Sequence, residues 1–248
     1  MVYRAVGLMS GSSLDGLDIA FAEFQEISGK WNVEIKAVAC YPYDDNWTKQ
    51  LTNAATLKAL DYQLLHAAYG HYSGNMVNRF IEENNLHHQV QLITSHGHTI
   101  FHFPARKMTA QLGDGAAIAA TTGINVVSDL RAIDIARGGH GAPIASIGEK
   151  LLFSDYSIFL NLGAIANISF NDPQNYTAFD ICPGGNVFSL LSPDKKRNFG
   201  NHWQLASAGQ TDEKLLSLLN DLEYYRLPYP KSLSTDFGTD VVYTLIRN

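Results

Sequence analysis

The opening stretch GLMSGSSLDG, residues 7–16, combines glycine, hydroxyl and carboxylate groups at one place in the chain. Ser10-Gly11-Ser12-Ser13 offers hydroxyls and backbone N–H groups at a bend, and glycine allows a ligand to approach the backbone closely. Successive N–H groups in a turn form a concavity that favours anions. Asp15 and Asp18 supply oxygen ligands for a metal ion that bridges phosphates. A plain hairpin turn, with Ser and Asp as turn formers, explains the same residues equally well.

Two later stretches have related chemistry. LNLGAIANIS, residues 160–169, places a glycine bend between two apolar runs and adds the polar side chains of Asn161, Asn167 and Ser169. FDICPGGN, residues 179–186, delivers Asp180 from the end of an apolar strand into a glycine-rich turn. An acid at a strand end is a candidate general base. Taken alone, Asp180 is equally well explained as a helix-capping residue.

The histidines of HGHTIFH raise the alternative of a metal site at residues 96–102. His98 and His102 lie four residues apart and would both bind zinc if the segment were helical. The residues TIFHF are instead typical of a strand, in which the two imidazoles lie far apart along the chain. His140, in GGHGAP, is expected to form hydrogen bonds in a loop.

Alternating strand and helix patterns must position these residues. YRAVGLMS and DGLDIAFAEF predict two strands joined by a hairpin bend at residues 11–16, and VEIKAVACYPY predicts a third strand. Apolar spacing over 57–84 predicts one or two amphipathic helices. Further strands are expected in QVQLITSHGHTIFHFP, INVVSDL, SIFLNLGAIANISF and YTAFDICP. Helices are expected in GDGAAIAATTG, after the PGG turn, in TDEKLLSLLNDLEYY and in TDVVYTLIRN. The class is therefore α/β, with a mixed sheet because hairpin-joined strands precede the first helix.

Composition excludes several function classes. The chain has 248 residues, 46% of them hydrophobic, which fits a globular protein of one or two domains. A net charge of −6 leaves no basic excess for a nucleic-acid backbone, so nucleic-acid binding is not expected. Two cysteines are too few for a disulfide framework. The chain has no apolar run of about 18 residues and no signal-peptide pattern, so we expect a cytoplasmic protein without a membrane segment.

Six ordered motifs together resemble the anhydro-N-acetylmuramic acid kinases. They are GLMSGSSLDGLD, SHGHTIFHFP, QLGDG, DLRAIDIARGGHGAP, LNLGAIANIS and FDICPGGN, and the resemblance runs from Gly7 to Ser232. That family belongs to the sugar kinase, actin and heat-shock chaperone ATPase superfamily. The resemblance implies a two-domain, ribonuclease-H-like (actin-like ATPase) fold that binds ATP and Mg²⁺ between its domains. We expect the domains at residues 1–127 and 128–248, with the second incomplete at its C-terminus.

The resemblance also implies an activity. The expected reaction opens the internal bridge of 1,6-anhydro-N-acetylmuramic acid with water and phosphorylates the six-position oxygen, giving N-acetylmuramic acid 6-phosphate, a step of cell-wall recycling. Asp180 then activates the water, and Asp15 lies nearest the metal. His96, Arg131 and Asp134 face the amino sugar, and we add the hypothesis that Arg131 pairs with its lactyl carboxylate. The residues expected at the nucleotide phosphates are Ser10, Gly11, Ser12, Ser13, Leu14, Asp15, Gly16, Leu17, Asn161, Gly163 and Asn167.

The chain departs from the family pattern in the turn after Asp180. Family members usually have Asp-Thr-Gly-Pro-Gly-Asn where this chain has DICPGGN, so that Cys182 replaces a glycine and one residue is added before Asn186. An alternative function is a truncated, non-catalytic module of the same fold that binds amino sugars or muropeptides. The resembled family also implies a homodimer.

Overall fold

The computed structural model describes the chain except for residues 173, 192–206, 235 and 248. It divides into two compact units, Met1–Gly141 and Ala142–Asn248. The division at Gly141 lies inside the glycine-rich segment that follows Arg131, and the expected domain limit at residues 127 and 128 stays a prediction.

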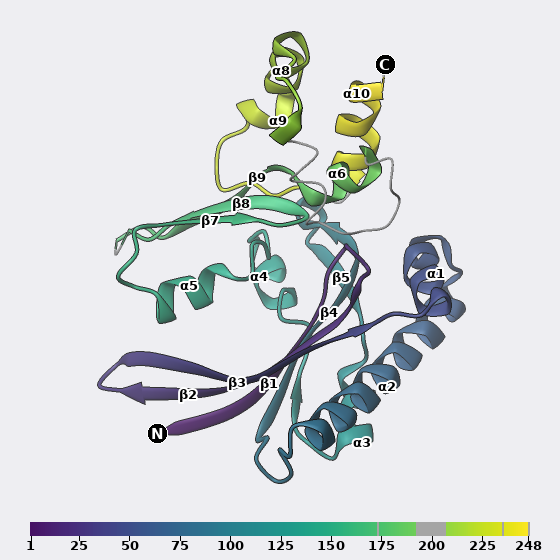
Figure 1. The fold of residues 1–248 in the computed structure, drawn as a ribbon, viewed down its shortest axis with the longest axis vertical. Helices are drawn as coiled ribbons and strands as arrows, with labels where there is room; N and C mark the ends of the chain where they lie inside the picture. The colour runs from purple at the N-terminus through teal and green to yellow at the C-terminus, as the bar shows by residue number, and fades with distance from the viewer. Residues whose placement is uncertain (173, 192–206, 235, 248) are drawn as a thin grey trace. The chain divides into compact units, whose positions relative to one another are not determined.

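Unit 1 is built on a six-stranded mixed sheet (Figure 1). Strand β1 runs antiparallel to β2 and parallel to β4, and β2 continues antiparallel into β3. Strand β4 also pairs with β5 in antiparallel and with β6 in parallel orientation, which gives the order β3-β2-β1-β4-β5 with β6 beside β4. The strands are β1 (Val2–Ser10), β2 (Gly16–Ile27), β3 (Lys30–Pro42), β4 (Leu92–Phe103), β5 (Met108–Leu112) and β6 (Val126–Val127).

Helices cover this sheet and close its apolar core. The long helix α2 packs against α3, and both lie beside the sheet (Figure 1). Phe21 of β2, Phe80 of α2 and Ile93 of β4 meet in one cluster and are almost fully buried. The helices of unit 1 are α1 (Asp45–Asn53), η1 (Ala54–Thr56), α2 (Ala59–Glu83), η2 (Pro104–Arg106), α3 (Gly115–Thr122) and α4 (Ala132–Ala136). This core fixes the register of β1 and β4, whose ends carry the residues singled out above.

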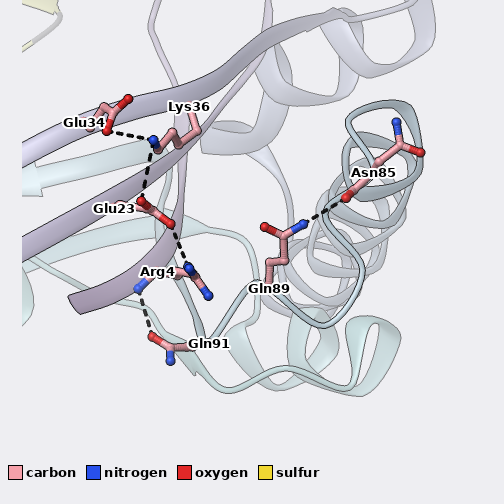
Figure 2. Close-up of polar contacts among 7 residues, drawn as sticks. All are labelled: Arg4, Glu23, Glu34, Lys36, Asn85, Gln89 and Gln91. Atoms are coloured by element: carbon pink, nitrogen blue, oxygen red, sulfur yellow. Dashed lines mark hydrogen bonds and ion pairs between the residues drawn. The ribbon is translucent and has the colours of Figure 1, made fainter. Parts of the chain in front are cut away.

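Charged side chains form a row of ion pairs across strands β1, β2 and β3 of the same sheet (Figure 2). Arg4 Nε of β1 lies 2.7 Å from Glu23 Oε1 of β2, and Lys36 Nζ of β3 lies 3.6 Å from Glu23 Oε2 and 2.7 Å from Glu34 Oε2. The Arg4 backbone N–H donates to Gln91 Oε1 at 2.9 Å, ahead of β4. The hydrogen bond and charge of Arg4 lower the pKa of Glu23. These pairs are solvent-exposed, so they favour the observed register more than they stabilise the fold.

Unit 2 contains a three-stranded antiparallel sheet of order β7-β8-β9. In Figure 1, helices α6, α8, α9 and α10 lie on one side of this sheet and α5 lies on the other. The elements are α5 (Ser146–Leu152), β7 (Ile158–Leu162), β8 (Ile165–Phe170), β9 (Thr177–Pro183), α6 (Gly185–Leu191), α8 (Glu213–Asn220), α9 (Glu223–Arg226), the π-helical turn η3 (Phe237–Tyr243) and α10 (Thr244–Arg247).

The expected α/β class with a mixed sheet is confirmed, as are both hairpins and the helix expected over 57–84, which runs from Ala59 to Glu83. Two expectations differ in extent. The strand in INVVSDL pairs with β4 over only two residues, Val126 and Val127. The helix that Asp212 caps ends at Asn220, because Leu222 takes an extended ψ of 138° before α9 begins.

Candidate functional site

The first hairpin connects β1 to β2 and divides into buried ends and an accessible loop. Ser10, Gly16 and Leu17 are buried, whereas Ser12 and Asp15 are exposed. The burial of Gly16 and Leu17 makes them framework residues of the sheet. The groups of this hairpin that a ligand reaches are therefore those of residues 11–15.

The loop is held by two internal contacts. Ser13 Oγ donates to Asp15 Oδ1 at 2.6 Å, and the Leu14 N–H donates to the Gly11 carbonyl at 3.3 Å. Leu14 adopts φ 53°, a left-handed conformation that is unusual for a residue with a side chain. Such a conformation persists only where the surroundings enforce it, and it often marks a ligand-binding turn. The loop thus presents hydroxyls, backbone N–H groups and one carboxylate in a tight bend.

The Ser10 side chain is buried and forms hydrogen bonds with neighbouring side chains. It is 3% exposed, and its Oγ lies 2.9 Å from His98 Nδ1 on β4. The Tyr43 hydroxyl donates to Ser10 Oγ at 2.8 Å and lies 2.5 Å from the Tyr69 hydroxyl. Sequence reasoning missed Tyr43 and Tyr69, because nothing in YPYDD or in the helical pattern over 57–84 distinguishes them from core aromatic residues.

The structure brings His96 and Arg131 together. Arg131 Nε donates to His96 Nε2 at 2.9 Å, and His96 Nδ1 lies 2.9 Å from the Gly97 carbonyl. A guanidinium only donates and a carbonyl only accepts, so His96 is neutral with its proton on Nδ1. Burial, then the Arg131 charge, lowers the pKa of His96 to about 4, against the smaller opposite effect of the Gly97 bond. His96 therefore holds Arg131 as a neutral acceptor across the physiological range.

Gly97 makes this arrangement possible. Its φ is +72°, and a Cβ at this position would collide with the Leu112 carbonyl oxygen on β5. Only glycine combines that conformation with so close a neighbour. Gly97 lies in a β-bulge of strand β4, where the register with β1 shifts by one residue between the pairs Leu8↔Ser95 and Ser10↔His98.

The third expected sugar-facing residue, Asp134, is turned toward its own loop. It is exposed, and its Oδ2 accepts the Gly141 N–H at 2.7 Å. This hydrogen bond links α4 to the end of the glycine-rich segment that follows it.

In unit 2, the second hairpin joins β7 and β8 and packs on the turn before α6. Asn161 and Asn167 face each other across the hairpin, the former exposed and the latter buried. The Gly163 carbonyl accepts the Gly185 N–H at 3.0 Å, and a Cβ on Gly184 would lie 2.6 Å from that carbonyl oxygen. Glycine at 184 therefore permits the close approach of the two turns.

Asp180 lies on β9 in register with Asn167 of β8 and is 4% exposed. Its Oδ2 accepts the backbone N–H of Leu233 at 2.9 Å, and its own carbonyl accepts the Tyr224 hydroxyl at 2.6 Å. These contacts fix both the carboxylate and the strand that carries it. A buried carboxylate held by a backbone N–H is suited to removing a proton from a positioned water.

Strand β9 is irregular directly after Asp180. Between Asp180 and Cys182, β9 is one residue out of step with β8, since Ala166 pairs with Cys182 and Asn167 with Asp180. Ile181 is thus a bulge residue directly beside Asp180, and bulges re-aim neighbouring side chains. The residue added relative to the family pattern lies further along the turn, between Pro183 and Asn186.

A zinc site at residues 96–102 required that segment to be helical, and this expectation is wrong. His98 and His102 both lie on strand β4, and they bond to Ser10 and Thr109 respectively. Among the residues that the structure describes, no three His, Cys, Asp or Glu side chains are placed to hold a metal ion together. The assignment of Asp15 as a magnesium ligand stays a prediction.

Comparison with known proteins decides the family. The sequence model for anhydro-N-acetylmuramic acid kinase matches residues 3–238. The chain belongs to the anhydro-N-acetylmuramic acid kinase family. A kinase of that name from Hydrogenovibrio crunogenus is 36% identical over 247 residues, which cover 95% of this chain and 65% of that protein. Those from Pseudoalteromonas atlantica and Coxiella burnetii are each 34% identical, covering 92% and 94% of this chain and 62% and 65% of their own lengths.

The chain thus spans somewhat less than two thirds of the length of these relatives. The family match includes both hairpins, His96, Arg131, Asp134 and Asp180. The mixed sheet of unit 1 and the antiparallel sheet of unit 2 are consistent with an actin-like ATPase-type fold. No helix in the described part of the chain combines the length and apolar character needed to cross a membrane.

Proposed function

We propose that this protein is an ATP-dependent kinase that opens 1,6-anhydro-N-acetylmuramic acid with water and phosphorylates the freed six-position oxygen. The observation that carries the proposal is the family match over residues 3–238, which contains every candidate site residue. The geometry of each unit supports it, because each presents a strand–turn–strand hairpin with polar groups at the bend.

In this proposal, the accessible loop of residues 11–15 binds the ATP phosphates through its N–H groups and hydroxyls. Asp15 is the residue of this loop that would hold Mg²⁺, directly or through water. When bound, the ion supplies charge neutralisation for the phosphates. The exposed Asn161 and the bend at Gly163 serve the phosphates from the second hairpin, while the buried Asn167 supports the strand beside Asp180.

Asp180 acts as the general base. It takes a proton from a water molecule whose oxygen attacks the anomeric carbon, and the bond from that carbon to the six-position oxygen breaks. The freed oxygen attacks the γ-phosphorus of ATP, and the bond to the ADP oxygen breaks. The Leu233 N–H contact fixes Asp180 Oδ2, which limits the directions from which the carboxylate meets water. Positioning of this kind is the main contribution of a protein to phosphoryl transfer.

His96 and Arg131 form the proposed recognition pair for the sugar. Because His96 accepts from Arg131 Nε, the guanidinium plane is held and its remaining N–H groups are oriented. A guanidinium of fixed orientation suits a carboxylate, and the lactyl group of the substrate carries one. Asp134 contributes indirectly, by shaping the segment that follows Arg131. Cytoplasmic location and a homodimer are further predictions that follow from the family.

The test is coupled ADP release by this chain with Mg-ATP and 1,6-anhydro-N-acetylmuramic acid, against a control without sugar. We expect sugar-dependent release, and we expect Asp180→Asn to abolish it while nucleotide binding persists. The matched control is Asp221→Asn in the same unit, which removes an exposed carboxylate paired with Arg226 at 3.0 Å and should keep full turnover. Sugar binding by folded protein without ADP release would favour the alternative, a sugar-binding module without turnover.

A further inference from the structure

We propose that Tyr43 and Tyr69 are positioning residues for the phosphate-binding hairpin and act on it through the Ser10 hydroxyl. The proposal rests on the proposed function of residues 11–15. Four side chains from separate elements form one chain of hydrogen bonds, in the order Tyr69, Tyr43, Ser10 and His98. They come from α2, from the segment after β3, from the end of β1 and from β4.

The donors in this chain can be assigned. The Tyr43 hydroxyl donates to Ser10 Oγ at 2.8 Å. A phenol carries a single hydrogen, so the 2.5 Å contact between the two tyrosines requires Tyr69 as the donor and Tyr43 as the acceptor. Burial lowers the pKa of His98 to about 4, so its ring is neutral at pH 7 and bonds to Ser10 as an uncharged partner. Each hydroxyl between Tyr69 and His98 is thereby engaged on both sides.

The consequence concerns what Ser10 does. At 3% exposure, its side chain faces the protein and not the loop that a ligand reaches. Its hydroxyl is therefore an anchor that fixes the last residue of β1, from which the loop of residues 11–15 departs. Tyr43 and Tyr69 hold that anchor from the helical side of the sheet, where Trp47 and Tyr72 pack around them. Loss of the anchor would let the loop shift without removing any group that contacts phosphate.

Removal of single hydroxyls tests this assignment. We expect Tyr43→Phe to raise the Kd for Mg-ATP and its KM by about threefold to tenfold, the range of one net hydrogen bond, with kcat for the sugar little changed. The matched control is Tyr62→Phe in the same aromatic cluster. The Tyr62 hydroxyl is buried without a hydrogen-bond partner among the described residues, so its removal should leave both constants unchanged.

A double-mutant cycle separates an effect through Ser10 from a general loss of packing. If Tyr43 acts through Ser10, the variant carrying both Ser10→Ala and Tyr43→Phe binds Mg-ATP no more weakly than the weaker single variant. Additive losses would overturn the proposal. So would a Tyr43→Phe protein whose Kd and KM for Mg-ATP are the same as those of Tyr62→Phe.

NMR of the imidazole nitrogens tests the anchoring of Ser10 independently of the proposed function. We expect Tyr43→Phe, and not Tyr62→Phe, to shift the His98 Nδ1 resonance, because Ser10 Oγ loses the donor opposite His98. If the wild-type chain does not bind Mg-ATP, the proposed function fails, and the His98 shift alone supports or overturns the anchoring of Ser10. An unchanged His98 resonance in Tyr43→Phe would show that the four side chains do not act as one unit.

Discussion

Acidification should destabilise unit 1 through its buried histidines. Burial lowers the pKa of His96 and of His98 to about 4, from the ordinary histidine value of 6.5. The unfolded chain therefore binds protons at these rings from about pH 6.5 downward, whereas the folded chain resists them until about pH 4. The stability that the neutral rings confer is complete above pH 6.5 and is lost as the pH falls toward 4.

The size of the effect follows from the pKa of each ring in the folded and unfolded chain. Each tenfold change in proton affinity corresponds to about 1.4 kcal/mol, so moving from pH 7 to pH 4.5 should lower the free energy of unfolding by about 2.5 kcal/mol for each ring. The sum of about 5 kcal/mol is comparable with the whole stability of many domains. His96 faces Arg131 and His98, and His98 faces Ser10 and His96, so neither ring has an acidic partner among these contacts to offset the loss.

Urea unfolding at a series of pH values measures this slope, with fluorescence of Trp47 as the probe because it packs edge-on against Tyr69 in unit 1. His98→Gln should remove about a third of the slope between pH 6.5 and 4.5, because burial also lowers the pKa of His102 to about 4 and that ring contributes as well. The control is His87→Gln, which removes an exposed imidazole near Glu82 and should leave the slope unchanged. A slope that is equal in wild type and His98→Gln, or stability that is flat over this range, would refute the reasoning.

Three further substitutions probe particular contacts. Gly97→Ala should lower the free energy of unfolding by at least about 2 kcal/mol more than Gly123→Ala. Both glycines have positive φ, but only at Gly97 would the added methyl group collide with a backbone carbonyl. Equal losses of stability in denaturant unfolding would contradict this. Tyr224→Phe removes the bond to the Asp180 carbonyl and should cost about 1–2 kcal/mol, with ADP release retaining its dependence on sugar; a thermal midpoint equal to wild type would count against it. Asp114→Ala removes the N-cap of α3, whose side chain accepts the Ala116 N–H at 2.8 Å, and should cost about 1 kcal/mol in denaturant unfolding, whereas Asp114→Asn should restore most of it.

The hairpins and the long helix were predictable because their patterns are local. Alternating apolar residues flank the glycine bend at 11–16, and the apolar spacing over 57–84 continues for about seven turns, so few other structures satisfy either pattern. Several short elements outside those patterns escaped prediction. Strand β5 has five residues, and helices α4 and α5 have five and seven, too few for periodicity to identify them.

The partners of the candidate site residues were less accessible to sequence reasoning. Ser10 bonds to His98 and Tyr43, which lie 88 and 33 residues away in the chain, and Asp180 bonds to Leu233, 53 residues away. Contacts of that separation depend on how the strands pair, and a single sequence carries little information on pairing. The family resemblance implied that His96 and Arg131 both face the sugar, whereas the hydrogen bond between them and the neutral state of His96 required the geometry of both ring nitrogens.

The one-residue offset between β1 and β4 has a consequence for how this protein tolerates change. From Leu8 to Ser10 the first strand advances two residues, while β4 advances three, from Ser95 to His98. A deletion of Gly97 would restore the regular count with His98 still opposite Ser10. The same deletion would remove the carbonyl that accepts the His96 Nδ1 proton, and with it a contact that orients His96 toward Arg131. A frame-preserving loss of the Gly97 codon should therefore be more harmful to this protein than most single substitutions elsewhere in the segment.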